Sequence, residues 1–255
     1  MHPLDLLYAF LAAIAGGFVN AVAGGGTLIT FPVLVALGIP AVSANLTNTI
    51  ALCPGYISGV FAQAKDFPSQ KQRLIRFLPA SIAGGVLGGV LLIFTNEDLF
   101  RKIIPFLILA ATILLSIQKI VKEHINKRRE GEHLNSSKNW ISFLLIFLAS
   151  IYGGYFGAGL GVILMSILGV VANDSLNKLN VLKQAISFSI NISAAIFFSF
   201  SGRAVWSIVL VMAIGASAGG IIGGKVSGKI RQEVLRWVIV IIGLSISIVY
   251  FLKLR

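Results

Sequence analysis

The sequence predicts an all-α polytopic membrane protein with two inverted structural repeats of about five helical segments each, containing broken or re-entrant glycine-rich hairpins. Three observations predict this class. The chain is 56% hydrophobic and 12% charged, with a mean hydropathy of +0.91, whereas soluble domains carry about 25% charged residues. Apolar stretches close to the length of a membrane span recur along it. The sequence also matches itself at one fixed offset.

Apolar segments follow one another along the chain, five in each half. They lie at 4–22, 27–38, 45–64, 74–94 and 100–118, and then at 140–158, 162–173, 179–200, 204–224 and 234–252. No Lys or Arg precedes the first segment, so we interpret it as a retained span rather than a signal peptide.

The second segment of each half is too short to cross a bilayer. At about 1.5 Å of rise per residue, a dozen residues cannot span about 30 Å of hydrocarbon. Each follows a glycine cluster, Gly24-Gly25-Gly26 in one half and Gly157, Gly159 and Gly161 in the other. We therefore expect a re-entrant or broken hairpin with its turn near the midplane, although a full crossing pair would leave the same parity.

The two halves align without a gap when the sequence is shifted by 135 residues. Asn45 then falls on Asn180 and Arg101 on Arg236, and the GGVLGG block that begins at Gly84 falls on the GGIIGG block that begins at Gly219. Scattered Leu and Ile coincide by chance, but these pairs do not easily do so. The sequence thus predicts a duplication whose period is too long for a solenoid and suits a two-halved transporter.

An odd number of segments per half predicts that the second half is inverted relative to the first. Most of the 21 Lys and Arg residues fall in the loops 65–76, 119–139, 173–183 and 225–236. The positive-inside rule places these loops in the cytoplasm and both termini outside. The expected organisation is a first transmembrane repeat at 1–118, a basic cytoplasmic linker at 119–139 and a second transmembrane repeat at 140–255.

The polar residues inside the membrane indicate an anion site. We place no Asp or Glu deep in a span, whereas the third segment of each half is rich in Asn, Ser, Thr and Gln. Helix starts behind the glycine clusters offer free N–H groups and a partial positive charge, and glycine lets a ligand approach the backbone. The candidate substrate-binding residues are Gly24, Gly25, Gly26, Thr27, Asn45, Asn48, Gly159, Gly161, Asn180, Lys183 and Gln184.

We expect Asn45, Asn48, Asn180 and Lys183 to line one central cavity, with both hairpin helix starts facing it. Because each pair lies near the beginning of its segment, the alternative is that the pairs sit on opposite sides of the membrane. Other readings also apply: spans use glycine for close packing, which we favour for the Gly84 and Gly219 blocks, and use Asn and Ser as interhelical hydrogen-bond partners. Lys183 is also near enough to the cytoplasmic boundary to snorkel.

The stretch AGGGTLITFPVLVALGIPAVSANLTNTIALCPG, with the later SIAGGVLGGVLL and its second-half echo, resembles the TauE/SafE family of sulfite exporters. The resemblance covers nearly the whole chain. In the second half Leu160 interrupts the glycine run and Ile167 stands where a proline is common. The resemblance implies a bacterial or plant inner-membrane transporter of sulfite, sulfoacetate or related sulfur oxyanions and organosulfonates.

The favoured function is a secondary transporter in the bacterial cytoplasmic membrane, with a small anionic substrate, the lipid bilayer as partner and no cofactor. The alternatives are a passive anion channel and a membrane-embedded enzyme, for which the spans lack a carboxylate pair, a His cluster or metal ligands. The net charge is +12, and the basic residues lie between apolar segments. We therefore interpret them as loop charges that face the cytoplasm and anionic lipid, not as a nucleic-acid interface. The sequence specifies no oligomeric state.

Overall fold

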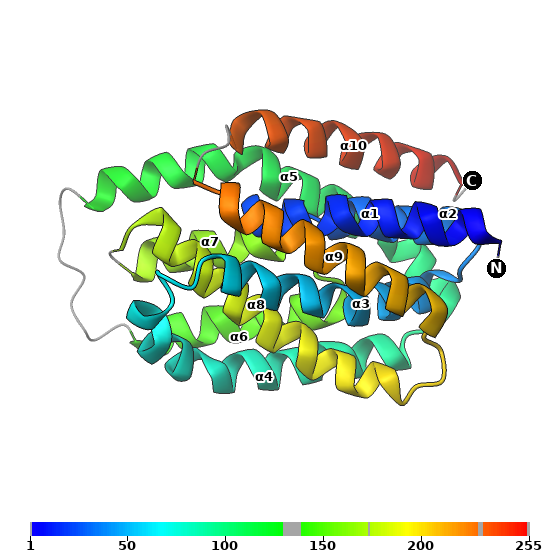
Figure 1. The fold of residues 1–255 in the computed structure, drawn as a ribbon, viewed down its shortest axis with the longest axis horizontal. Coiled ribbons are helices and arrows are strands. Elements are labelled where there is room, and N and C mark those ends of the chain that lie inside the picture. The colour runs from blue at the N-terminus through cyan, green and yellow to red at the C-terminus, as the bar shows by residue number, and fades with distance from the viewer. Residues whose placement is uncertain (1, 130–138, 173, 229–231, 254–255) are drawn as a thin grey trace.

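The computed structural model describes residues 2–129, 139–172, 174–228 and 232–253, which form helices joined by short connections (Figure 1). The first half contains α1 (Pro3–Val22), α2 (Thr27–Ala36), α3 (Ala41–Ala62), the 3-10 turn η1 (Pro68–Gln70), α4 (Lys71–Phe94) and α5 (Glu97–Arg129). The second half contains α6 (Asn139–Tyr155), α7 (Leu160–Val171), α8 (Leu176–Ser199), α9 (Trp206–Val226) and α10 (Gln232–Lys253). Each predicted apolar segment is a helix, so the all-α class is confirmed.

Six helices of the described chain are long and apolar enough to cross a membrane. They are α1, the helix formed by η1 with α4, the first part of α5, α8, α9 and α10. The helices α2 and α7 contain only 10 and 12 residues. The chain is therefore a multi-pass membrane protein with one short helix near the start of each half.

Helix α5 extends past the expected end of the first repeat, but its span-length apolar part is Glu97–Ile117, so the domain boundary at residue 118 stays a prediction. Helix α5 continues to Arg129 instead of ending near residue 118. The added residues are mostly Lys, Glu, Ile and Arg, which favour or tolerate helix, and they include neither Gly nor Pro to stop it. Residues 130–138 of the expected linker lie outside the described residues.

Each short helix folds back from a left-handed glycine turn. Gly24 has φ 89° and Gly157 has φ 74°, a region that glycine adopts without strain. The Gly24 N–H bonds to Val19 O, and the Gly157 N–H bonds to Tyr152 O, so both first helices end in the same way. The second turn begins slightly earlier than the repeat offset predicts. Both halves therefore contain a broken hairpin.

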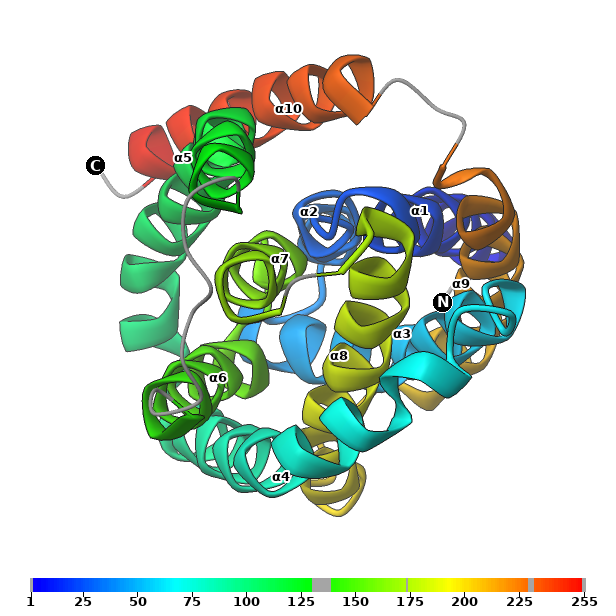
Figure 2. The same ribbon diagram turned by 90° about the vertical axis from the view of Figure 1, so that its left-hand side faces the viewer.

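The two halves are interleaved, so that helices of one half pack mainly on helices of the other (Figures 1 and 2). Helix α1 packs on α9 as α6 packs on α4, and α3 packs on α9 as α8 packs on α4. The pairs α3 with α8 and α5 with α10 join equivalent helices. The duplication seen in the sequence thus also appears in the packing, while the sidedness of the halves in the membrane stays a prediction.

Close approach at the GGxxGG blocks makes this interleaving possible. A Cβ added to Gly84 would lie 2.5 Å from Ser150 Cβ on α6, and one added to Gly85 would lie 2.5 Å from Ile190 O on α8. In the second half, a Cβ on Gly223 would lie 2.7 Å from Phe18 O on α1. The packing role expected for these blocks is confirmed, because neighbouring backbones occupy the space of the missing side chains.

Candidate substrate site

The two glycine turns touch each other inside the protein. The Gly161 N–H donates to Gly24 O at 3.3 Å. A Cβ on Gly24 would lie 2.5 Å from Gly161 Cα, so no side chain fits between the turns. The structure therefore brings Gly24 and Gly161 together as the contact between the two broken hairpins.

The other residues of the turns face neighbouring helices. A Cβ on Gly25 would lie 2.9 Å from Leu115 Cδ1, and one on Gly159 would lie 3.3 Å from Ala111 Cβ, both on α5. The Gly26 N–H donates to Asn20 Oδ1 at 2.7 Å. Thr27 is buried as the first residue of α2. Gly25 and Gly159 thus pack on α5, so their absent side chains do not by themselves indicate an approach path for a ligand.

Lys183 and Asn180 on α8 cap the end of α1. The Lys183 ammonium, 1% exposed, donates to Asn20 O at 3.1 Å, and Asn180 Nδ2 donates to Ala21 O at 3.0 Å. These carbonyls belong to the last turn of α1, where helix carbonyls lack partners in their own helix. Lys183 does not snorkel to the boundary, because its ammonium is held inside the protein at the broken end of α1.

Gln184 lies beside this cap with an unused amide. It is fully buried, and neither its Nε2 nor its Oε1 has a hydrogen-bond partner within the described residues. Gly59 of α3 provides the space for the Gln184 amide, since an added Cβ there would overlap Nε2. We call Asn20, Asn180, Lys183 and Gln184 the Lys183 cluster. Its free amide and single-partnered ammonium leave hydrogen-bond donors available to a ligand.

A second polar cluster lies at the end of α6. Asn45 Nδ2 on α3 donates to Tyr155 O at 2.8 Å. Asn45 and Asn48 are 0% and 1% exposed, and the Oδ1 atom of each lacks a partner among the described residues. We call Asn45, Asn48 and the Tyr155 carbonyl the Asn45 cluster.

The expectation that both Asn pairs line one central cavity is wrong. Asn180 Nδ2 also donates to Gln63 Oε1 at 3.0 Å, and Gln63 immediately follows α3, whereas Asn45 lies near the beginning of that helix. At about 1.5 Å per residue, these two ends are roughly 25 Å apart. Because α3 and α8 pack against each other in opposite directions, equivalent positions fall at opposite ends of the pair. The two Asn pairs are therefore separated, as the alternative expected, and their role in substrate binding stays a prediction.

Asn20 was not among the residues predicted from the sequence, although both its backbone and its side chain accept hydrogen bonds in the Lys183 cluster. Its carbonyl accepts from Lys183 and its Oδ1 from Gly26. An Asn four residues before Gly24, within an apolar segment, was an available signal. The partner of that Asn lies 163 positions away along the chain, a pairing that local sequence does not reveal.

The buried charges of the described chain are both positive. Lys183 and Arg236 are buried, and no Asp or Glu of the described residues is. Arg236 has a carboxylate neighbour, with Nη2 3.6 Å from Glu233 Oε1, whereas within the described residues the Lys183 ammonium bonds only to a backbone carbonyl. No group of three or more His, Cys, Asp or Glu residues gathers within the described ranges. The Lys183 cluster therefore carries a buried positive charge with no carboxylate partner within the described residues.

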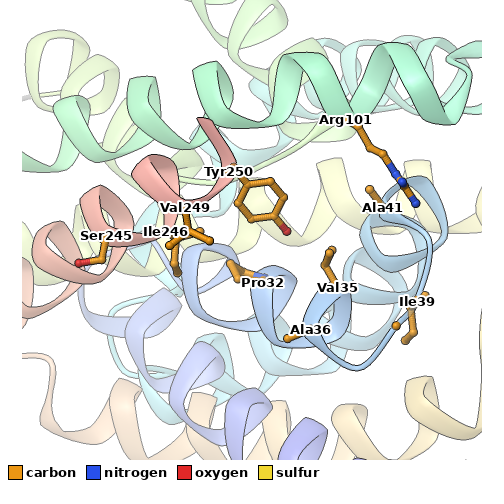
Figure 3. Close-up of a pocket in the computed structure, with 11 residues that line it drawn as sticks. Pro32, Val35, Ala36, Ile39, Ala41, Arg101, Ser245, Ile246, Val249 and Tyr250 are labelled. Carbon is orange, nitrogen blue, oxygen red and sulfur yellow. The ribbon is translucent and has the colours of Figure 1, made fainter. Parts of the chain in front are cut away.

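A lateral cavity that the sequence did not reveal lies between α2 and α10 (Figure 3). It encloses about 730 Å³ and is lined by Pro32, Val35, Ala36, Gly38, Ile39, Ala41, Arg101, Ser245, Ile246, Val249 and Tyr250. At its edge Arg101 Nε lies 3.6 Å from Glu97 Oε1, and the Glu97 carboxylate accepts the backbone N–H groups of Ala41 and Val42. The lining is apolar apart from Arg101, Ser245 and the Tyr250 hydroxyl, unlike that of the Lys183 cluster.

Interleaved helical halves, broken hairpins whose turns meet, and a buried polar cluster at a helix break define a membrane transporter. The family model of the sulfite exporter TauE/SafE family matches residues 9–250, and the chain belongs to that family.

Similar proteins carry transporter names. The chain is 27% identical to the probable membrane transporter protein YfcA of Escherichia coli K12, over 97% of this chain and 90% of that protein. It is 26% identical to the probable membrane transporter protein ORF9 of Sinorhizobium sp., over 95% and 91% of the two chains. A probable membrane transporter protein of Haemophilus influenzae is 27% identical, over 85% and 83%. No solved structure gives a significant match.

Proposed function

We propose that this protein is a secondary transporter that moves a small anion, such as sulfite, an organosulfonate or a related sulfur oxyanion, across the bacterial cytoplasmic membrane. The observation that carries this proposal is the Lys183 ammonium, which is 1% exposed and, within the described residues, bonds only to the carbonyl oxygen of Asn20. A buried charge without a counter-charge costs several kcal/mol. A bound anion would supply that counter-charge.

The neighbours of Lys183 suit an oxyanion with several acceptor atoms. The Gln184 amide has two N–H donors and no partner within the described residues. Hydrogen bonds to a charged oxygen are shorter and stronger than those between neutral groups. An oxyanion that accepts from Lys183 and Gln184 would therefore satisfy both the buried charge and the buried amide. The family description adds sulfite as the first compound to test.

The contact between the two hairpins is a position from which a substrate could reach either side of the membrane. The Lys183 cluster lies at the break of α1, the Asn45 cluster at the break of α6, and the Gly24–Gly161 contact joins the two hairpins. In transporters with repeated halves, sites form at such breaks, and alternating access results when one unit moves against the other. Motion at this contact would expose the anion alternately to each side.

The test is a ligand screen on the purified protein by thermal shift, with sulfite, sulfate, thiosulfate, taurine, sulfoacetate and simple carboxylates. At least one anion should stabilise the wild type. Lys183→Gln should weaken that anion's binding about 30-fold or more, because removing one partner of a buried charged hydrogen bond costs about 2–5 kcal/mol.

Lys178→Gln is the matched control. Lys178 lies on the same helix, its side chain is 39% exposed, and its ammonium pairs with Asp174 at 3.3 Å. The same change there should leave anion binding within about twofold of wild type. Comparable small effects of both variants, or no stabilising anion at all, would contradict the proposed role of Lys183. Flux in liposomes that is electrogenic and needs no coupling ion would assign a passive channel instead.

A further inference from the structure

The repeat makes the Asn45 cluster the counterpart of the Lys183 cluster. At the offset of 135 residues, Asn45 corresponds to Asn180 and Asn48 to Lys183. Both Asn residues donate to the last turn of the broken first helix of the other half, Asn45 to Tyr155 O and Asn180 to Ala21 O. The two clusters thus have the same arrangement. The main difference is that the ammonium of the Lys183 cluster is replaced by the neutral amide of Asn48 in the Asn45 cluster.

The first-half site lacks the positive charge that the second-half site contains. The Oδ1 atoms of Asn45 and Asn48 are buried without a partner within the described residues. The Asn45 amide is oriented by its bond to Tyr155 O, which leaves Oδ1 as its free atom. The end of α6 adds the partial negative charge of a helix C-terminus. Leaving buried acceptors unmatched costs about 1–3 kcal/mol each.

We infer that the Asn45 cluster binds a dehydrated monovalent alkali cation, Na⁺ in the first instance, in the position that the Lys183 ammonium takes in the other half. Carbonyl and amide oxygens are the ligands that hard cations take in proteins. Unwound carbonyls and C-terminal ends of half-helices coordinate Na⁺ in transporters with broken helices. Asn45 Oδ1, Asn48 Oδ1 and the carbonyls at the end of α6 provide such a set.

The charge of the site selects a monovalent ion over a divalent one. All ligands of the Asn45 cluster are neutral, and the described residues contain no group of three or more His, Cys, Asp or Glu residues. Calcium and magnesium sites use carboxylates to balance two charges. A single charge held by neutral oxygens and one helix end requires no carboxylate.

The cation site also suggests how an anion would be driven, and this part rests on the proposed function. A cation at the Asn45 cluster and an anion at the Lys183 cluster would sit on either side of the Gly24–Gly161 contact. If both ions must be bound before the hairpins move, the cation gradient drives the anion. The binding of the cation itself does not depend on that role.

The experiment measures the melting temperature of the purified full-length protein, without added substrate, in NaCl, KCl or choline chloride at constant ionic strength. The wild type should show a saturable rise with Na⁺ that choline does not produce. A larger rise with K⁺ would keep the cation site and reassign its ion. Asn48→Lys should be stabilised in choline chloride and should lose the response to Na⁺, because its ammonium takes the place of the ion.

Two further variants keep the test decisive. Asn48→Leu should lose the Na⁺ response without adding a charge, which covers the case in which Asn48→Lys does not fold. Asn191→Leu is the control, because Asn191 is also buried but donates to Ser187 O within its own helix. It should keep the Na⁺ response. Radiolabelled sodium should bind to the wild type and to Asn191→Leu, and its binding to Asn48→Leu should be lost.

Equal melting temperatures of the wild type in all three salts, or an unchanged Na⁺ response in Asn48→Leu, would overturn the inference. These results are separable from the proposed function. A Na⁺ response with no stabilising anion would contradict anion transport and leave the cation site standing. Anion binding that depends on Lys183, without any cation response, would support the transporter and reject the cation site.

Discussion

At the scale of single residues, Asp174 shows how a loop carboxylate holds two parts of the chain together. It lies between α7 and α8 and accepts from Gln70 Nε2 at 2.8 Å and from Arg73 Nη1 at 2.7 Å. Partial burial alone would raise the pKa of Asp174, but the hydrogen bonds from Gln70, Arg73, the Ser175 backbone and Lys178 outweigh it and lower the pKa to about 2. The carboxylate thus fixes the α7–α8 loop to the start of α4.

This pKa predicts a pH dependence of stability. A carboxyl whose pKa is lower in the folded than in the unfolded state stabilises the fold above its unfolded pKa, near 3.8, and loses this effect as pH falls through about 2. We expect Asp174→Asn to lower the free energy of unfolding at pH 7 by about 1 kcal/mol after solvent screening. Thermal melts in detergent should show this difference shrinking between pH 4 and pH 2. A constant difference across that range, or an equal effect of Asp98→Asn at an exposed position, would contradict the assignment.

The residue types of the candidate site could be predicted from the sequence, but their grouping could not. Asn180, Lys183 and Gln184 form one buried cluster, as the polar third segment indicated. Asn45 and Asn48 belong to the other end of α3, because the pairing of α3 with α8 is antiparallel. Which helices pair is decided by packing between residues far apart in the chain, and hydropathy carries no information on it.

At the scale of elements, segment lengths and glycine positions predicted the helices well. The broken hairpins followed from segments too short to span and from glycine clusters, because both are local properties of the chain. The end of α5 was missed because polarity marks the membrane boundary and not the helix end. The lateral cavity between α2 and α10 was missed because it depends on how two helices from different halves are placed.

The contact between the hairpins predicts a specific sensitivity to side chains. Gly24→Ala should prevent stable folding or lower the melting temperature by many degrees, because its Cβ would lie 2.5 Å from Gly161 Cα and its φ is 89°. Gly38→Ala is the matched control: Gly38 has φ 84°, but an added Cβ meets nothing within 4 Å. The left-handed conformation alone costs about 1–2 kcal/mol. Detergent melts of both variants measure the difference, and equal losses would mean that backbone strain, not the hairpin contact, sets the sensitivity.

At the scale of the whole molecule, the two ends differ in the segments that they carry. Both termini lie at one end, and the starts of α4, α6 and α8 lie at the opposite end (Figure 1). The segments at the latter end contain Lys65, Lys71, Arg73, Arg76, Lys178 and Lys225, and the basic residues in the last part of α5 also belong to it. From the positive-inside rule we predict that this end faces the cytoplasm.

Cysteine accessibility tests this orientation. In a Cys53→Ser background, Ser69→Cys should be protected from an impermeant thiol reagent in intact cells, and Asp98→Cys should be labelled. Ser69 and Asp98 are both exposed. Ser69 lies in η1, just before α4, and Asp98 lies at the start of α5, just after α4, so the two mark opposite ends of that helix. Asn135, which would test the linker directly, lies outside the described residues. Labelling of Ser69→Cys without lysis, with protection of Asp98→Cys, would reverse the orientation.

The interleaving of the halves has a consequence for biosynthesis. Helices α1 and α3 emerge early from the ribosome, yet both pack on α9, which is among the last helices to be made. Until α9 is inserted, Gly17 of α1 lacks the backbone that it packs against in the finished protein, at Ala216. In the nascent chain, α1 and α3 must therefore remain in lipid without their contacts to α9 until translation is nearly complete. A half-length chain could bury the same surfaces only against a second copy of itself.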